Sequence, residues 1–82
     1  MPVSGEIDHE GPDPVYVQLA AILRARIGSG ELPHGRALPS RERLAAEFGV
    51  SRGTCEKALA ILREEGLVKT SFGRGVYVTK RP

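Results

Sequence analysis

Apolar residues recur at spacings of three and four along the segment that follows Pro14. This spacing places side chains on one face of an α-helix. We therefore expect a first helix that begins at Pro14 and runs to about Ile27 or Ser29, with Gly28 and Gly30 ending it. Its inward face comprises Tyr16, Leu19, Ala20, Leu23 and Ile27.

Two shorter helices are predicted further along, each beginning after a serine. Ser40 and Ser51 can accept a hydrogen bond from an amide of the first helical turn, as N-cap residues do. Gly49 supplies the turn between these helices, and Gly66 ends the second of them. The side chains directed inward are Leu44, Ala45 and Phe48, then Ala58, Leu59, Leu62 and, less securely, Cys55.

The last part of the chain has the pattern of a β-hairpin. Residues 67–71 and 76–79 are β-prone, and Phe72-Gly73-Arg74-Gly75 between them has the glycines of a tight loop. Ala37-Leu38-Pro39 can form only a very short extended segment, because proline lacks an amide donor. The predicted fold is therefore α+β: a small winged helix-turn-helix, with three helices followed by a two-stranded β-hairpin wing.

Charge is distributed unevenly along the chain. Four acids and no bases occur in residues 1–14, whereas residues 15–82 hold all 12 Lys and Arg against six acids. We expect residues 1–13 to form an acidic, disordered leader, and residues 14–82 to form the folded domain. The positive excess of that domain suits a polyanionic partner.

Several functional classes are disfavoured by what the sequence lacks. One cysteine and two distant histidines offer no internal disulfide and no metal-ligand spacing, so we expect neither a metal nor another cofactor. A nucleophile–base pair and a phosphate-binding loop are also missing, so we do not expect an enzyme. No apolar run could span a bilayer and the acidic start is no secretory signal, so we expect a cytoplasmic protein without membrane contact.

The start of the third predicted helix carries polar residues where a helix-turn-helix meets base edges in the major groove. Arg52 can form a bidentate pair with guanine, and Thr54 can bond a base or phosphate or touch a thymine methyl group. Gly53 permits close approach of the backbone, and Ser51 leaves free amides for a phosphate. Lys57 is expected to contact a phosphate.

Further candidate DNA contacts lie in the second helix and the wing. Two arginines in the first turn of the second helix oppose the helix dipole, which a nearby phosphate would explain. The wing carries a lysine on its first strand and an arginine between the two glycines of its loop. A thin, basic loop of this kind suits an adjacent minor groove. These candidates are Ser40, Arg41, Arg43, Lys69, Gly73, Arg74 and Gly75. Individually, Arg24, Arg26, Arg63, Lys80 and Arg81 are expected to be solvated surface charges.

An ordered set of motifs resembles the GntR family of bacterial repressors. The motifs are Leu38-Pro39-Ser40-Arg41-Glu42, Val50-Ser51-Arg52-Gly53-Thr54, Ala58-Leu59, Leu62, Glu65-Gly66-Leu67-Val68 and Gly73-Arg74-Gly75. The resemblance implies a transcription regulator that binds double-stranded operator DNA through Arg41, Arg52 and Thr54, with Gly73 and the wing in the minor groove. It also implies inverted-repeat half-sites and a homodimer on DNA. A winged helix that docks to another protein is the alternative.

Two features depart from the pattern of the family. Many relatives have a basic residue where this chain has Glu56. Glu56 could accept from a cytosine amino group or pair with Arg52 one helical turn earlier, and we favour the pairing. Family members usually continue into an effector-binding domain, whereas this chain ends at Pro82, so we expect no effector site within it.

Overall fold

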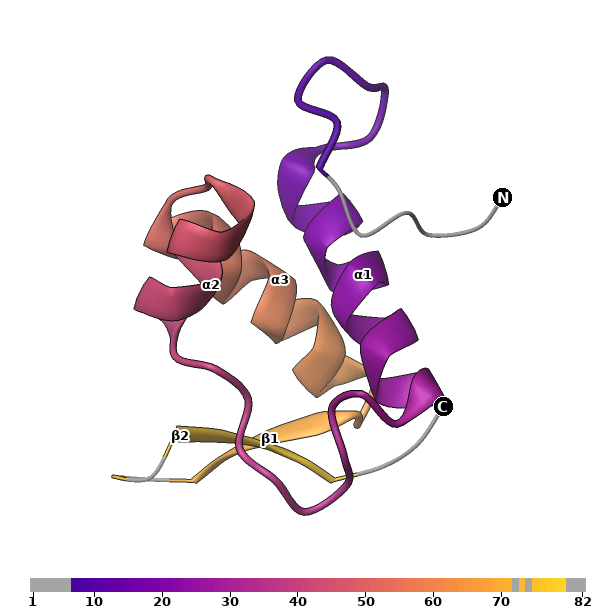
Figure 1. The fold of residues 1–82 in the computed structure, drawn as a ribbon, viewed down its shortest axis with the longest axis vertical. Helices are drawn as coiled ribbons and strands as arrows, with labels where there is room; N and C mark the ends of the chain where they lie inside the picture. Colours follow the sequence, from indigo (N-terminus) through magenta and orange to yellow (C-terminus); the bar gives the residue numbers. More distant parts are fainter. Residues whose placement is uncertain (1–6, 72, 74, 80–82) are drawn as a thin grey trace.

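The computed structural model describes residues 7–71, 73 and 75–79. Three helices, α1 (Val15–Ser29), α2 (Arg41–Phe48) and α3 (Arg52–Glu64), precede an antiparallel hairpin of β1 (Val68–Ser71) and β2 (Gly75–Val78). Figure 1 shows the hairpin lying below the helices. The predicted α+β winged helix-turn-helix is confirmed. The predicted division of the chain after residue 13 stays a prediction.

Backbone hydrogen bonds cap both ends of helix α1. The carbonyl of Pro14 accepts from the amides of Val17 and Gln18, and Gly30, at φ +86°, donates to the carbonyl of Ile27. The prediction that Gly28 also ends the helix is wrong, because Gly28 lies inside α1. Glycine inside a helix costs only about 1 kcal/mol, which burial of the adjacent Ile27 offsets.

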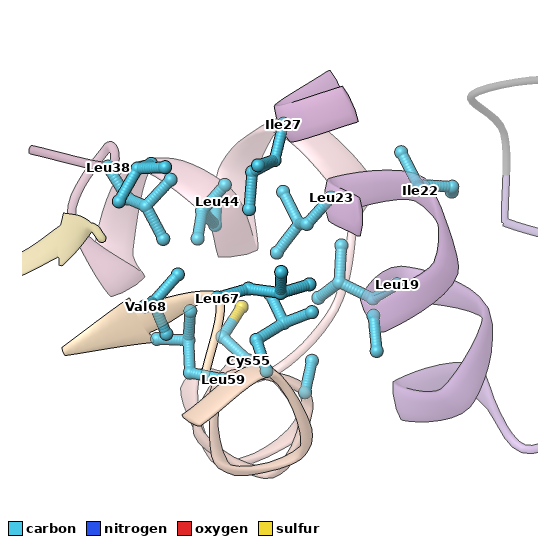
Figure 2. Close-up of a cluster of buried hydrophobic side chains, with 14 of the residues drawn as sticks. Leu19, Ile22, Leu23, Ile27, Leu38, Leu44, Cys55, Leu59, Leu67 and Val68 are labelled. Atoms are coloured by element: carbon cyan, nitrogen blue, oxygen red, sulfur yellow. The ribbon is translucent and has the colours of Figure 1, made fainter. Parts of the chain in front are cut away.

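The core lies where the three helices and the base of the hairpin meet (Figure 2). Leu19 and Leu23 of α1 and Leu62 of α3 are fully buried, and each such side chain contributes about 1.5–3 kcal/mol. Ile22 is also buried, although the sequence pattern did not include it. Other predicted inward residues are confirmed as buried, namely Ala20, Ile27, Leu44, Phe48, Cys55, Ala58 and Leu59, whereas Tyr16 and Ala45 are only half-buried.

Both predicted serine caps are present. The Ser40 hydroxyl accepts from the amide of Arg43 at 3.2 Å, and the Ser51 hydroxyl accepts from the amide of Thr54 at 3.0 Å. Gly49 adopts a left-handed conformation at φ +66° between the two helices, as the turn requires. These local contacts set where α2 ends and where α3 begins.

The hairpin is joined to the helices by the linker that precedes α2. Ala37 forms a bridge with Tyr77, and the amide of Leu38 donates to the carbonyl of Val76 at 2.7 Å. This confirms the very short extended segment before Pro39. Val78, paired with Val68 across the hairpin, is buried against the core. The base of the wing is thus packed against the domain.

Part of the predicted leader forms a turn against α1. The side chain of Gln18 accepts from the amide of Asp8 and donates to the carbonyls of Asp8 and Asp13, each at 2.8 Å. Ile7 packs at the edge of the core. A glutamine amide has the donors and the acceptor needed to hold such a turn. The predicted disorder of residues 1–6 lies outside the described residues.

Candidate nucleic-acid interface

Two hollows bring together candidate residues from α2, α3 and the wing. A groove of about 410 Å³ runs between α3 and the hairpin, and Ser40, Arg41, Gly73 and Gly75 line it. A second hollow of about 300 Å³ is lined by Arg41, Arg52, Gly53 and Glu56. The fold therefore places the start of α2 beside both the start of α3 and the wing.

Among the described candidates, five line neither hollow: Arg43, Ser51, Thr54, Lys57 and Lys69. Arg43, Lys57 and Lys69 are exposed, and Lys57 lies 5.6 Å from the centre of the Tyr16 ring. That distance permits a cation–π contact between α3 and the start of α1. Arg74 lies outside the described residues. The contacts of all these residues with DNA stay predictions.

The first turn of α3 presents an exposed cation beside an ordered backbone. The Arg52 side chain is 70% exposed. Ser51 both caps the helix and donates from its hydroxyl to the Thr54 hydroxyl at 3.0 Å. Thr54 is thus part of the cap. Its hydroxyl oxygen already accepts one hydrogen bond before any ligand binds.

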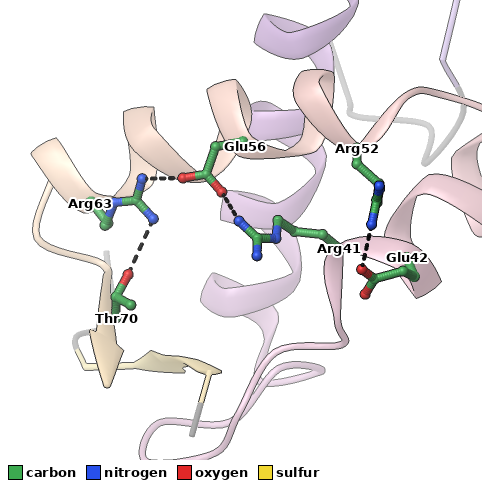
Figure 3. Close-up of polar contacts among 6 residues, drawn as sticks. All are labelled: Arg41, Glu42, Arg52, Glu56, Arg63 and Thr70. Carbon is green, nitrogen blue, oxygen red and sulfur yellow. Dashed lines mark hydrogen bonds and ion pairs between the residues drawn. The ribbon is translucent and has the colours of Figure 1, made fainter. Parts of the chain in front are cut away.

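The favoured pairing of Arg52 with Glu56 is wrong. Arg52 instead donates through Nη1 to Oε1 of Glu42 on α2, at 3.2 Å. Both oxygens of Glu56 already accept hydrogen bonds from other arginines (Figure 3). The crossing of α2 over α3 brings Glu42 within reach of Arg52, which is a relation that local spacing does not report.

Glu56 lies at the centre of a network that we call the Glu56 clasp, made of Arg41, Glu56, Arg63 and Thr70. Oε2 accepts from Nη1 of Arg41 at 2.8 Å, and Oε1 accepts from Nη2 of Arg63 at 2.7 Å. Nη1 of Arg63 donates to the Thr70 hydroxyl on β1 at 3.2 Å. The clasp therefore joins α2, α3 and the wing. Sequence spacing could have suggested Arg63, because residues seven apart share one face of a helix.

The charges on this surface shift the titration of its acids. Hydrogen bonds from Arg63 and then Arg41 lower the pKa of the Glu56 carboxyl. A backbone hydrogen bond and then the hydrogen bond from Arg52 lower the pKa of Glu42. Both acids are therefore ionised at neutral pH. The surface carries fixed negative charges among its arginines.

Three arginines that were predicted to be solvated surface charges instead tie elements together: Arg63 in the Glu56 clasp, and Arg24 and Arg26 between helices. Arg24 donates to both oxygens of Glu65, at 2.8 and 2.7 Å, and so joins α1 to the end of α3. Arg26 pairs with Glu47 at 2.9 Å and lies 5.1 Å from the centre of the Phe48 ring. These pairs assign Arg24 and Arg26 to the scaffold. Lys80 and Arg81 lie outside the described residues.

The family model for bacterial regulatory proteins of the gntR family matches residues 15–78, which span all three helices and the hairpin. The chain belongs to the GntR family. This GntR-family chain is 40% identical over 74 residues to the HTH-type transcriptional repressor NagR of Bacillus subtilis. The alignment covers 90% of this chain and 30% of NagR. The chain is 44% identical over 68 residues to the repressor MngR of Escherichia coli, covering 83% of this chain and 28% of MngR. The chain thus spans less than a third of either relative.

Solved structures share the same fold. YtrA from Sulfolobus acidocaldarius, a GntR-family transcription factor, superposes with a TM-score of 0.84 at 35% identity, over 94% of this chain and 81% of that one. The AraR DNA-binding domain in complex with operator ORX1 superposes with a TM-score of 0.82 at 30% identity, over 90% of this chain and 95% of that one. The winged helix described above is therefore a GntR-type DNA-binding domain.

Two further properties concern the residues that the structure describes. Each helix in this part of the chain is too short or too polar to span a bilayer. The same residues hold no group of three or more His, Cys, Asp or Glu suited to a metal ion.

Proposed function

We propose that this GntR-family domain binds duplex DNA at a specific sequence and represses transcription from there. The observation that carries the proposal is the exposed Arg52 on the first turn of α3, held beside the Ser51 cap. A helix-turn-helix inserts this end of its second helix into the major groove. Two relatives, NagR and MngR, are named as repressors.

Within this proposal each polar residue of α3 makes a different contact with DNA. Arg52 pairs with a guanine, because a guanidinium matches the two acceptors on its major-groove edge. Gly53 allows close approach of the backbone. The Thr54 hydroxyl accepts from Ser51 and keeps its own proton to donate to a base or phosphate, and its methyl group can touch a thymine methyl group. Lys57 contacts a phosphate from the second turn.

The start of α2 and the wing are proposed to hold the DNA backbone. Ser40 leaves helix amides and a positive dipole end for a phosphate, and Arg41 and Arg43 add charge beside them. Gly73, Gly75 and the neighbouring Arg74 and Lys69 are proposed to enter or border the adjacent minor groove. The groove between α3 and the hairpin is proposed to face the sugar-phosphate strand that separates the two DNA grooves.

The wider properties of the regulator are also proposals. We propose two copies bound to an inverted-repeat operator, because two-fold protein symmetry matches two-fold DNA sites. We further propose a cytoplasmic location beside the chromosome, and binding in place of catalysis as the function of the domain.

Selection of duplexes from a random pool tests the proposal directly. We expect enrichment of one half-site, repeated in inverted orientation. Arg52→Ala should then weaken binding to the selected duplex by about 1–3 kcal/mol more than binding to random duplex. Arg24→Ala is the matched control, because Arg24 pairs with Glu65 on the scaffold.

Two results would count against this function. Equal losses on selected and random duplex for Arg52→Ala would remove the claim of specificity. Phosphate contacts release counterions, so the affinity for duplex DNA should fall as salt is raised. An affinity for duplex that does not change with salt would count against DNA as the partner and would favour the protein-docking alternative.

A further inference from the structure

Glu56 places a carboxylate on the surface that is proposed to meet a polyanion. Its side chain is 42% exposed and lines both hollows. An unpaired carboxylate there would repel phosphate. The two guanidiniums of the clasp, from Arg41 and Arg63, remove that penalty and leave a net positive charge. The clasp therefore makes the acid compatible with a surface that meets phosphate.

Direct recognition of a base by Glu56 is unfavourable. Each of its oxygens already accepts a short hydrogen bond from a charged donor. Charge-assisted bonds of this kind are stronger than those between neutral groups. A cytosine amino group would have to compete with an arginine for either oxygen, so Glu56 is better suited to act through its partners.

The clasp restricts Arg41. Arg41 comes from the first turn of α2, and its guanidinium is held at 2.8 Å by a residue of α3. Arg63 anchors the same carboxylate from the other side and is itself bonded to Thr70 in the wing. A side chain ordered in advance loses less rotamer entropy when it binds. Arg41, whose side chain is 55% exposed, is thus biased toward one direction by its bond to Glu56.

Arg52 is held more loosely than Arg41, whose pair with Glu56 is shorter, less exposed and anchored by Arg63. Its single bond to Glu42 is 3.2 Å long, and the two side chains are 70% and 63% exposed. Exposed pairs of this kind contribute little to stability. Arg52 can leave Glu42 for a base at small cost, whereas Arg41 stays directed by the clasp.

We propose that Glu56 is a positioning residue that sets sequence specificity through Arg41, with Arg63 as its anchor. The proposal rests on the DNA-binding function proposed above. Glu56 aims Arg41 from the rim of the groove at one point on the operator, and it does so without contacting DNA itself.

The test compares binding to the selected duplex with binding to random duplex of the same length, for Glu56→Gln, Arg63→Gln and Glu64→Gln. Glu64→Gln is the matched control, because it makes the same charge change on the same helix at an exposed residue outside the clasp. We expect Glu56→Gln to lower the ratio of the two affinities on the order of fivefold or more, and Glu64→Gln to lower it far less.

The Arg63 variant supplies a signature that charge alone does not produce. Arg63→Gln changes the charge in the opposite direction to Glu56→Gln, yet it should also lower the specificity ratio. In a Glu56→Gln background, Arg41→Gln should cost little further specificity, because the two residues act as one unit. Thermal unfolding identifies any variant that fails to fold. If Glu56→Gln is such a variant, Arg63→Gln carries the comparison, because it removes the anchor of Glu56.

Several outcomes would overturn the inference. Glu56→Gln matching Glu64→Gln would show that Glu56 contributes only charge. A changed base preference in Glu56→Gln alone, with Arg63→Gln unaffected, would make Glu56 a direct base contact. Lower melting temperatures with unchanged ratios would make the clasp only structural. A wild-type domain that enriches no sequence would instead overturn the proposed function itself.

Discussion

Arg52 and Glu42 form an ion pair between the first turns of α3 and α2, with Nη1 lying 3.2 Å from Oε1. The pair lies where the proposed major-groove contacts begin. A base or phosphate that binds Arg52 must therefore displace or share a carboxylate of the same chain. If Arg52 contacts DNA as proposed, Glu42 competes with DNA for its guanidinium.

Removing that competitor should strengthen binding. We expect Glu42→Gln to raise the affinity for both selected and random duplex by about two- to fivefold at low salt, because the exchange of Arg52 no longer breaks an ion pair. The measurement is a fluorescence titration at two salt concentrations. Glu47→Gln, on the same helix but paired with Arg26, is the control. Equal effects of the two variants would reduce the role of Glu42 to net charge.

Gly53 separates a folding role from a binding role. A methyl group there would meet only the Ser51 hydroxyl, at 3.8 Å, so Gly53→Ala should stabilise the domain by about 0.4–1 kcal/mol. Affinity for duplex should nevertheless fall, because the methyl group would stand between the backbone and the DNA. Denaturant unfolding and duplex titration on the same samples measure both effects.

Gly49 provides the contrast, because its φ of +66° is unfavourable for other residues. Gly49→Ala should destabilise the domain by about 1–2 kcal/mol. Unchanged affinity in Gly53→Ala would show that the backbone of α3 does not approach DNA closely at this position.

Stability should fall as the solution is acidified. Glu42, Glu56 and Glu65 have pKa values lowered from 4.5, with the Arg24 hydrogen bond as the main cause at Glu65. Because the unfolded chain then binds protons more tightly, their contribution is complete above about pH 4.5 and is lost as pH falls through the lower folded values. Unfolding in denaturant between pH 7 and pH 3 measures this. A flat profile for the wild type would contradict these ion pairs, and Glu65→Gln should flatten the profile in part.

The sequence by itself determined the elements of the fold. Ser40, Gly49 and Ser51 were assigned correctly because a cap or a left-handed turn depends on residues two to four apart. The spacing of Leu19, Leu23 and Ile27 likewise identified the buried face of α1, since helical period is a local property. Ile22 was missed because it lies off the main stripe, where burial depends on what packs there.

Only the tertiary structure decided which charges meet. Glu56 seemed best placed to pair with Arg52, four residues earlier, but its partners are Arg41, 15 residues away, and Arg63, seven away. Arg52 meets Glu42 across ten residues. Long, exposed side chains of opposite charge have many partners of similar energy within reach. The choice among them depends on how α2 crosses α3 and where the wing returns, which is set by the packing of the core.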